Sequence, residues 1–147
     1  MHTFKLEHFY RAHPLTPSLE FSTLTNFEER LVVDALLLRA RDANGSPAEI
    51  MLQLAAQAAA LPGVNLEERP IGLRRVFEMC RLNPGPVIYV QWGSLCDIDR
   101  FDREDLEKYF YDIWYPGADD IELFDSTYEW LVFVAHFGAV SLWLPTQ

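Results

Sequence analysis

The chain has 147 residues, half of them apolar, and a formal net charge of −10 at pH 7. This length fits a single domain over residues 1–147, with enough apolar material for a core that needs no disulfide or metal. The two cysteines, Cys80 and Cys96, are too few for a disulfide framework or an all-cysteine zinc site. No signal-peptide pattern opens the chain, and its most apolar stretch, 130–144, is too short to cross a bilayer. We therefore expect a cytoplasmic protein.

The negative charge is concentrated in the C-terminal third of the chain. Residues 97–147 contain 12 acidic and 3 basic side chains, whereas residues 1–96 are almost neutral. Binding to a phosphate backbone or to an anionic membrane requires the opposite sign, so we expect neither nucleic acid nor a membrane as partner. The field of such a surface attracts a basic protein. The alternative is a solvated acidic surface that only maintains solubility.

The N-terminal half is predicted to be mostly helical. A loose alternation of apolar residues predicts an edge strand over 3–10, and a second short strand is predicted over 19–24. Thr25 and Glu28 match a capping box at the start of a helix over 27–41. Ser46-Pro47-Ala48-Glu49 is a stronger start signal, with a cap serine, a first-turn proline and a glutamate that reaches back. That helix should continue to residue 60, and a third should cover 70–82.

The pattern changes to a period of two after residue 86. Strands are predicted over 87–92, 121–124, 129–136 and 139–144, with the last two forming a hairpin around Phe137-Gly138. Asp102 is the predicted N-cap of a short acidic helix over 103–113. The predicted fold class is therefore α+β, with a helical N-terminal half packed on a C-terminal antiparallel β-sheet.

No motif indicates a catalytic residue, a cofactor or a metal. Glycine-rich phosphate loops do not occur, and the four histidines lack the spacing of a helical metal site. A calcium loop that starts at Asp97 would need glycine and glutamate where the chain has Asp102 and Lys108. Ser94 and Cys96 follow a predicted strand, as nucleophiles often do. Because the second glycine of a nucleophile elbow is missing, a strand-to-loop turn explains them better.

The aromatic run 109–115 is too dense for every ring to face one side of a helix. Some rings are therefore expected at an interface, where Tyr and Trp are enriched. With the neighbouring carboxylates they predict an acidic, aromatic docking surface for a basic protein. The alternative is a helix enclosed between two layers of its own domain. The expected partner-binding residues are Asp97, Asp99, Asp102, Asp105, Tyr111, Trp114, Tyr115, Asp119, Asp120, Glu122 and Asp125.

The segments WYPGADDIELFD (114–125) and WLVFVAHFG (130–138) resemble the closing strands of immunity proteins from bacterial polymorphic toxin systems. Those proteins are small, acidic, cytoplasmic α+β proteins that neutralise a cognate toxin by binding it. The resemblance implies a non-enzymatic inhibitor that occludes a basic toxin or enzyme. One alternative is an accessory or adaptor domain, encoded by a mobile element, that oligomerises through its aromatic surface. Another is a small ligand-binding domain or enzyme that uses His136 with a nearby carboxylate.

Overall fold

The computed structural model describes residues 1–40, 45–68, 70–93 and 97–145. Its strands form one antiparallel sheet in the order β1-β4-β3-β5-β6-β7-β2. The strands are β1 (Phe21–Thr23), β2 (Ala59–Asn65), β3 (Val87–Gln91), β4 (Ile98–Asp102), β5 (Ile121–Asp125), β6 (Leu131–Val134) and β7 (Ala139–Trp143). The helices are α1 (Thr3–Ala12), α2 (Asn26–Arg39), α3 (Pro47–Gln57), α4 (Leu73–Met79) and α5 (Arg103–Ile113). The α+β class is confirmed.

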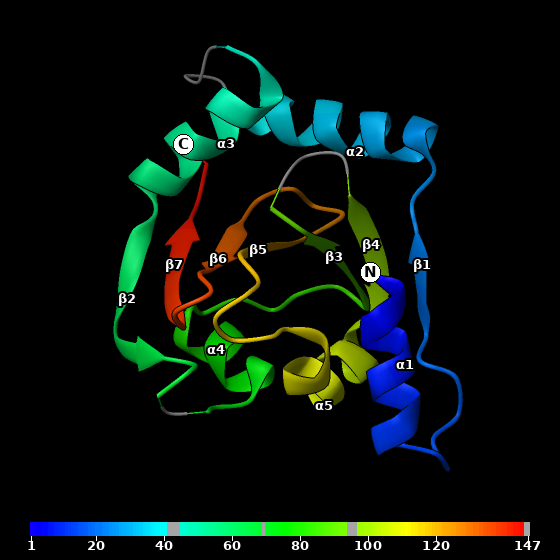
Figure 1. The fold of residues 1–147 in the computed structure, drawn as a ribbon. Helices are drawn as coiled ribbons and strands as arrows, with labels where there is room; N and C mark the ends of the chain where they lie inside the picture. The colour runs from blue at the N-terminus through cyan, green and yellow to red at the C-terminus, as the bar shows by residue number, and fades with distance from the viewer. Residues whose placement is uncertain (41–44, 69, 94–96, 146–147) are drawn as a thin grey trace.

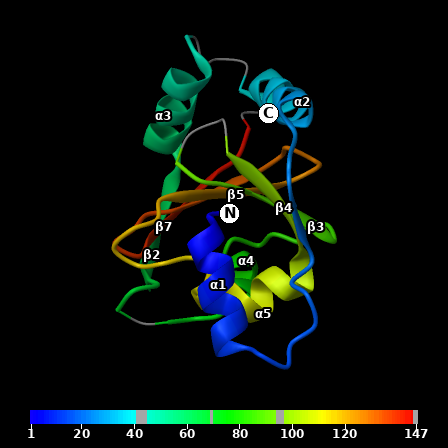
Figure 2. The ribbon, with the colours of Figure 1, turned by 45° about the vertical axis from the view of Figure 1, so that its right-hand side comes forward.

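Helices cover both faces of the sheet. α2 and α3 lie on one side, and α1, α4 and α5 lie on the other (Figures 1 and 2). Neighbouring residues of a strand point to opposite faces. Leu123 and Phe124 of β5 are both fully buried, so the core extends on both sides of the central strands. None of the helices in the described ranges has the length and apolar content that a membrane crossing requires.

The three capping signals read from the sequence are confirmed. The backbone N–H groups of Thr25 and Ser46 donate to the carboxylates of Glu28 and Glu49 at 2.8 and 2.7 Å, and each cap hydroxyl accepts the reciprocal bond. The Asp102 side chain accepts from the backbone N–H groups of Glu104 and Asp105 in the first turn of α5. Each cap satisfies donors that a helix start leaves unpaired.

Residues 3–10 form helix α1, so the prediction of an edge strand there is wrong. The buried side chains of this helix are Lys5 and Phe9, which are four residues apart and therefore share one helical face. The apolar residues that suggested a strand are partly exposed, Phe4 at 49% among them. Because one of its two buried positions is a lysine, the segment lacks the helical spacing of apolar residues that would have predicted a helix.

The helical N-terminal half is only partly correct, because β1 and β2 come from it and form the two edges of the sheet. Residues 59 and 60 were expected to end a helix, yet the segment 59–65 pairs with β7, with a shift of register around Pro62 and Gly63. An edge strand tolerates proline and glycine because one side of it needs no partner. Strand β4 was not predicted either. Buried and exposed residues do not alternate regularly in β4, because the charged Asp99 is buried beside Ile98.

Candidate functional site

Three of the side chains expected to bind a partner lie inside the protein, and the expectation for them is corrected. Asp99 and Trp114 are 0% exposed, and Asp125 is 2% exposed. The indole N–H of Trp114 donates to the carbonyl of Asp119 at 2.8 Å, and its ring stacks on Phe110. Trp114 therefore holds the turn after α5 against the core and cannot anchor a partner.

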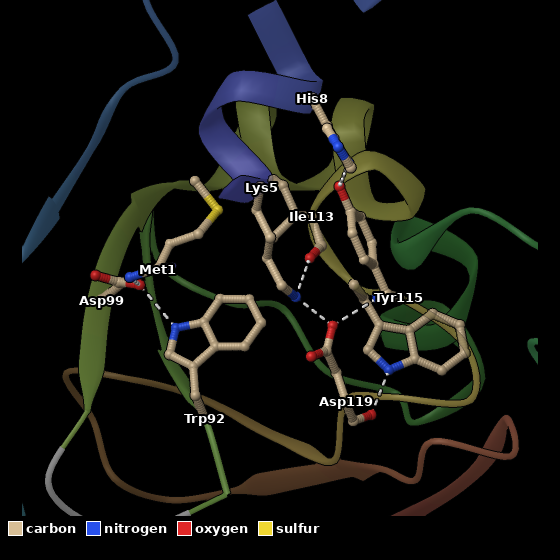
Figure 3. A network of polar contacts seen from close by, with 9 residues as sticks. Met1, Lys5, His8, Trp92, Asp99, Ile113, Tyr115 and Asp119 are labelled. Carbon is tan, nitrogen blue, oxygen red and sulfur yellow. Dashed lines mark hydrogen bonds and ion pairs between the residues drawn. The ribbon is translucent and has the colours of Figure 1, made fainter. Parts of the chain in front are cut away.

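Asp119 belongs to a buried polar network around Lys5 (Figure 3). The Lys5 ammonium, 1% exposed, donates to the Asp119 carboxylate and to the carbonyl of Ile113, the latter at 2.9 Å. It also lies over the rings of Trp92 and Tyr115, at 4.3 and 4.5 Å from their centroids. The backbone N–H of Tyr115 donates to the same Asp119 carboxylate at 2.7 Å. One carboxylate thus joins α1 to the segment that follows α5.

Asp99 forms the other end of this network (Figure 3). Its carboxylate accepts from the Met1 amino group, from the Trp92 indole N–H at 2.7 Å and from the Thr23 hydroxyl at 2.6 Å. These partners come from the start of the chain, from β1 and from the residue that follows β3. The buried charge of Asp99 is therefore compensated by groups distant in sequence.

The electrostatics of Lys5 reflect two opposed effects. Burial lowers the pKa of its ammonium group, and the hydrogen bond and charge of Asp119 oppose that shift, with a smaller contribution from Asp99. A buried lysine with a lowered pKa is sometimes a nucleophile. Here the amino group is enclosed by two hydrogen-bond acceptors and two aromatic rings, so the network is suited to holding α1 in place.

Several carboxylates gather at the start of α5. They line a hollow of about 380 Å³, which we call the acidic groove, together with Thr16, Pro17, Ser18 and Tyr109. Its acidic side chains are Glu20, Asp102, Glu104 and Asp105, and Lys108 is the one cation in its lining. Asp105 also accepts from the backbone N–H of Glu20 at 2.8 Å. Of the predicted binding residues, this groove brings together Asp102 and Asp105.

The remaining predicted residues are scattered. Asp97 is half-buried and immediately precedes β4. The Tyr111 hydroxyl accepts from the backbone N–H of Ile71 at 3.1 Å, and burial raises the pKa of Tyr111. Tyr115 is half-buried against His8, and burial raises the pKa of its hydroxyl as well. A continuous docking surface made of all the predicted residues therefore does not form.

Asp120 and His136 meet at the tip of the β6–β7 hairpin. The Asp120 carboxylate accepts from the backbone N–H of His136 at 2.7 Å and lies 2.9 Å from its Nδ1. The carboxylate that an acid–base role for His136 requires is thus within reach. Both side chains are about half exposed, at 59% and 48%, so the pair has no shielding from water. These contacts fix the segment before β5 against the turn between β6 and β7.

A second hollow, of about 250 Å³, lies between α3 and the sheet, and no sequence pattern predicted it. We call it the α3 pocket. Gln91 of β3 and Glu122 of β5 supply its polar side chains and are register partners on neighbouring strands. The rest of its lining is apolar or glycine: Ala48, Met51, Leu52, Ala55 and Gly93.

Both polar residues of the α3 pocket carry an unpaired buried oxygen. Oε1 of Gln91 and Oε2 of Glu122 have no hydrogen-bond partner, although buried polar atoms in proteins nearly always have one. Burial, and then the nearby charge of Asp120, raise the pKa of Glu122 to about 7. Glu122 was predicted as a surface residue for a protein partner, and it lies instead in this pocket.

Comparisons with protein-family models, with curated proteins and with solved structures gave no match. Within residues 1–40, 45–68, 70–93 and 97–145, no three His, Cys, Asp or Glu side chains are placed to hold a metal ion together. Ser94 and Cys96 lie outside the described residues. The functional assignment must therefore rest on charge and on the two hollows.

Proposed function

We propose that the protein is a small cytoplasmic inhibitor, of the kind represented by bacterial immunity proteins, that binds a basic toxin or enzyme and occludes it. The observation that supports this proposal is the acidic groove, in which four carboxylates and a single lysine surround one hollow. A concave surface of one sign attracts the opposite charge and orients it during encounter. A lysine or arginine of the partner is the complementary group.

The surroundings of the groove leave its sign unchanged. Arg74 and Arg103 lie next to it, and both donate to the carboxylate of Glu107, at 2.9 and 2.7 Å. Their charge is thus partly compensated by a residue that is itself almost buried. The carboxylates of Glu20 and Glu104 have no such ion pair among the described residues.

The groove also has an aromatic floor. Tyr109 lines it and packs edge-on against Phe9 of α1, with ring centroids 5.0 Å apart. The ammonium group of Lys108 lies 4.7 Å above the same ring. Tyr109 is itself buried, at 7% exposed, so it shapes the groove from below and is not an exposed anchor. The contacts that the groove offers a partner are therefore its carboxylates.

The test begins with capture of partners from lysate of the protein's own source, followed by association kinetics with the purified partner at low and high salt. We expect one basic partner and an association rate that falls as salt rises, because exposed charges are screened. The double variant Glu20→Lys, Glu104→Lys should lower the association rate at least tenfold. Glu67→Lys, Glu68→Lys, which makes the same charge change in a loop after β2, serves as the control.

The two double variants separate the local effect of the groove from the effect of total charge. An equal loss of association rate in both would show that only total charge matters, and the acidic groove would not be the interface. Association that is insensitive to salt would contradict the steering mechanism altogether. A captured partner whose activity is unchanged in the complex would contradict inhibition.

A further inference from the structure

The α3 pocket contains two buried side-chain oxygens, one on Gln91 and one on Glu122, that accept no hydrogen bond. Gln91 and Glu122 are opposite each other in an antiparallel pair, so their side chains leave the same face of the sheet. Each carries a buried oxygen without a partner. Gln91 is only 2% exposed, so water at the surface does not satisfy its oxygen. A ligand that donates hydrogen bonds would complete the site.

The charge around the pocket favours a cationic donor. Glu122 lies near a second carboxylate, Asp120, whose charge opposes ionisation of Glu122. No lysine, arginine or histidine forms an ion pair with Glu122 in the described part of the chain. The neighbouring carboxylate Asp120 already has a partner, because it lies 2.9 Å from Nδ1 of His136. A bound cation would offset the unfavourable burial of the carboxylate.

The walls of the pocket favour a hydrocarbon chain. Ala48, Met51, Leu52 and Ala55 form one face of α3 above the two polar residues. A volume of about 250 Å³ corresponds to roughly eight water molecules at ~30 Å³ each. This is small for a ligand site and suits a compact amphiphile. Leu52 is 71% exposed and lies at the rim, where a ligand could enter.

We propose that the α3 pocket binds a primary alkylammonium ion, with its charged end between Glu122 and Gln91 and its chain along α3. An ammonium group offers three donors, two of which the unpaired oxygens can accept. The pocket and the acidic groove are on opposite faces of the sheet, because α3 and α5 cover different sides (Figures 1 and 2). The inference therefore does not depend on the proposed inhibitor function.

The test titrates n-hexylammonium into the full chain and detects binding by changes in amide NMR chemical shifts. It is done at about pH 8, where the Glu122 carboxylate is mostly ionised. We expect saturable shifts in α3, β3 and β5 with a dissociation constant of about 1 mM, a usual range for so small a ligand. 1-Hexanol has the same chain without the charge and should bind at least tenfold more weakly.

Two variants test the two ends of the ligand separately. Glu122→Gln keeps the shape of the side chain and should weaken hexylammonium at least tenfold, while the affinity for hexanol should change little. Ala55→Leu keeps both polar residues and should block both probes, because a larger side chain would occupy the apolar part of the pocket. Glu68→Gln, in a loop after β2, is the matched control and should bind like the parent chain.

Three results would overturn the proposal. Hexanol that binds as tightly as hexylammonium would show a merely apolar hollow. Undiminished binding to Glu122→Gln would show that the carboxylate is not the recognition group. A complete absence of saturable shifts, even with a lysine-containing peptide as second probe, would show that the pocket does not bind an alkylammonium group. Binding of that peptide without the free amine would assign the pocket to a protein partner.

Discussion

Replacing Glu122 with glutamine should make the protein more stable at alkaline pH and remove part of its pH dependence. The pKa of Glu122 is raised from the ordinary value of 4.5 to about 7, mainly because burial disfavours the charged form. A carboxyl whose folded-state pKa is raised favours the folded state when it is protonated. This contribution is complete below about pH 4.5 and is lost as the pH rises towards about 7. Glutamine carries no charge at any of these pH values.

The magnitude follows from the two pKa values. A difference of one pKa unit corresponds to about 1.4 kcal/mol, so a shift from 4.5 to about 7 changes stability by about 3.5 kcal/mol at most. Part of that loss has already occurred at about pH 5, where the unfolded chain is mostly ionised. Between about pH 5 and pH 9, the stability of Glu122→Gln relative to the parent should therefore increase by about 2.5 kcal/mol.

The assay is urea unfolding of the parent chain and the variant at several pH values, with the difference between the two as the measured quantity. Taking this difference cancels the titration of the histidines and of the other carboxylates. Glu68→Gln removes an exposed carboxylate and should show a difference that is nearly independent of pH. A difference for Glu122→Gln that is flat, or that falls as the pH rises, would refute the assignment of a buried, destabilised carboxylate at this position.

Other variants test the buried network, a close approach of the backbone and a buried thiol. Asp119→Asn should lower the free energy of unfolding by about 3 kcal/mol in urea titrations, because it leaves the buried Lys5 charge without its counter-ion, and Lys5→Met should cost less. Gly138→Ala should destabilise by more than about 2 kcal/mol, because its added Cβ would clash with the end of β2, whereas Gly117→Ala meets only open space and should cost about 1 kcal/mol. Burial raises the pKa of Cys80 to about 11, so a variant with Cys80 as the only cysteine should be alkylated much more slowly when folded than in urea.

The features of the fold that the sequence predicted are those with short-range causes. A capping box needs two residues three apart, and both boxes, at Thr25–Glu28 and Ser46–Glu49, are present. The strands β3, β5, β6 and β7 were predicted from β-branched and aromatic content, and all four occur close to the expected bounds. Such patterns are visible in a window of a few residues.

The features that were missed depend on contacts between distant parts of the chain. Lys5 can occupy a core position of α1 only because Asp119, 114 residues away, supplies its counter-charge. Asp99 can lie buried in β4 because Thr23 and Met1 donate to it. In both cases the local pattern places a charged residue where an apolar one is expected, so the periodicity indicates the wrong element.

The α3 pocket was out of reach for a related reason. Glu122 was singled out by charge alone, and Gln91 had no distinguishing feature in an apolar strand. Their pairing depends on the strand order, which places β3 between β4 and β5. The closing wall comes from α3, about 40 residues earlier in the chain. The spacing of residues in the sequence does not indicate that β3, β5 and α3 meet in space.

Because several acidic residues are buried in such contacts, the inhibitor proposal must be tested with variants of exposed carboxylates. The acidic excess of residues 97–147 overstates the charge that a partner would meet, because Asp99 and Asp125 are buried and Asp119 binds Lys5. Reversing the charge of Asp119 would place two positive groups together inside the protein, and lost binding would then report unfolding. Glu20 and Glu104 are exposed and hold no buried cation. Their reversal leaves the network of Figure 3 intact, so a change in partner affinity there reports on the surface itself.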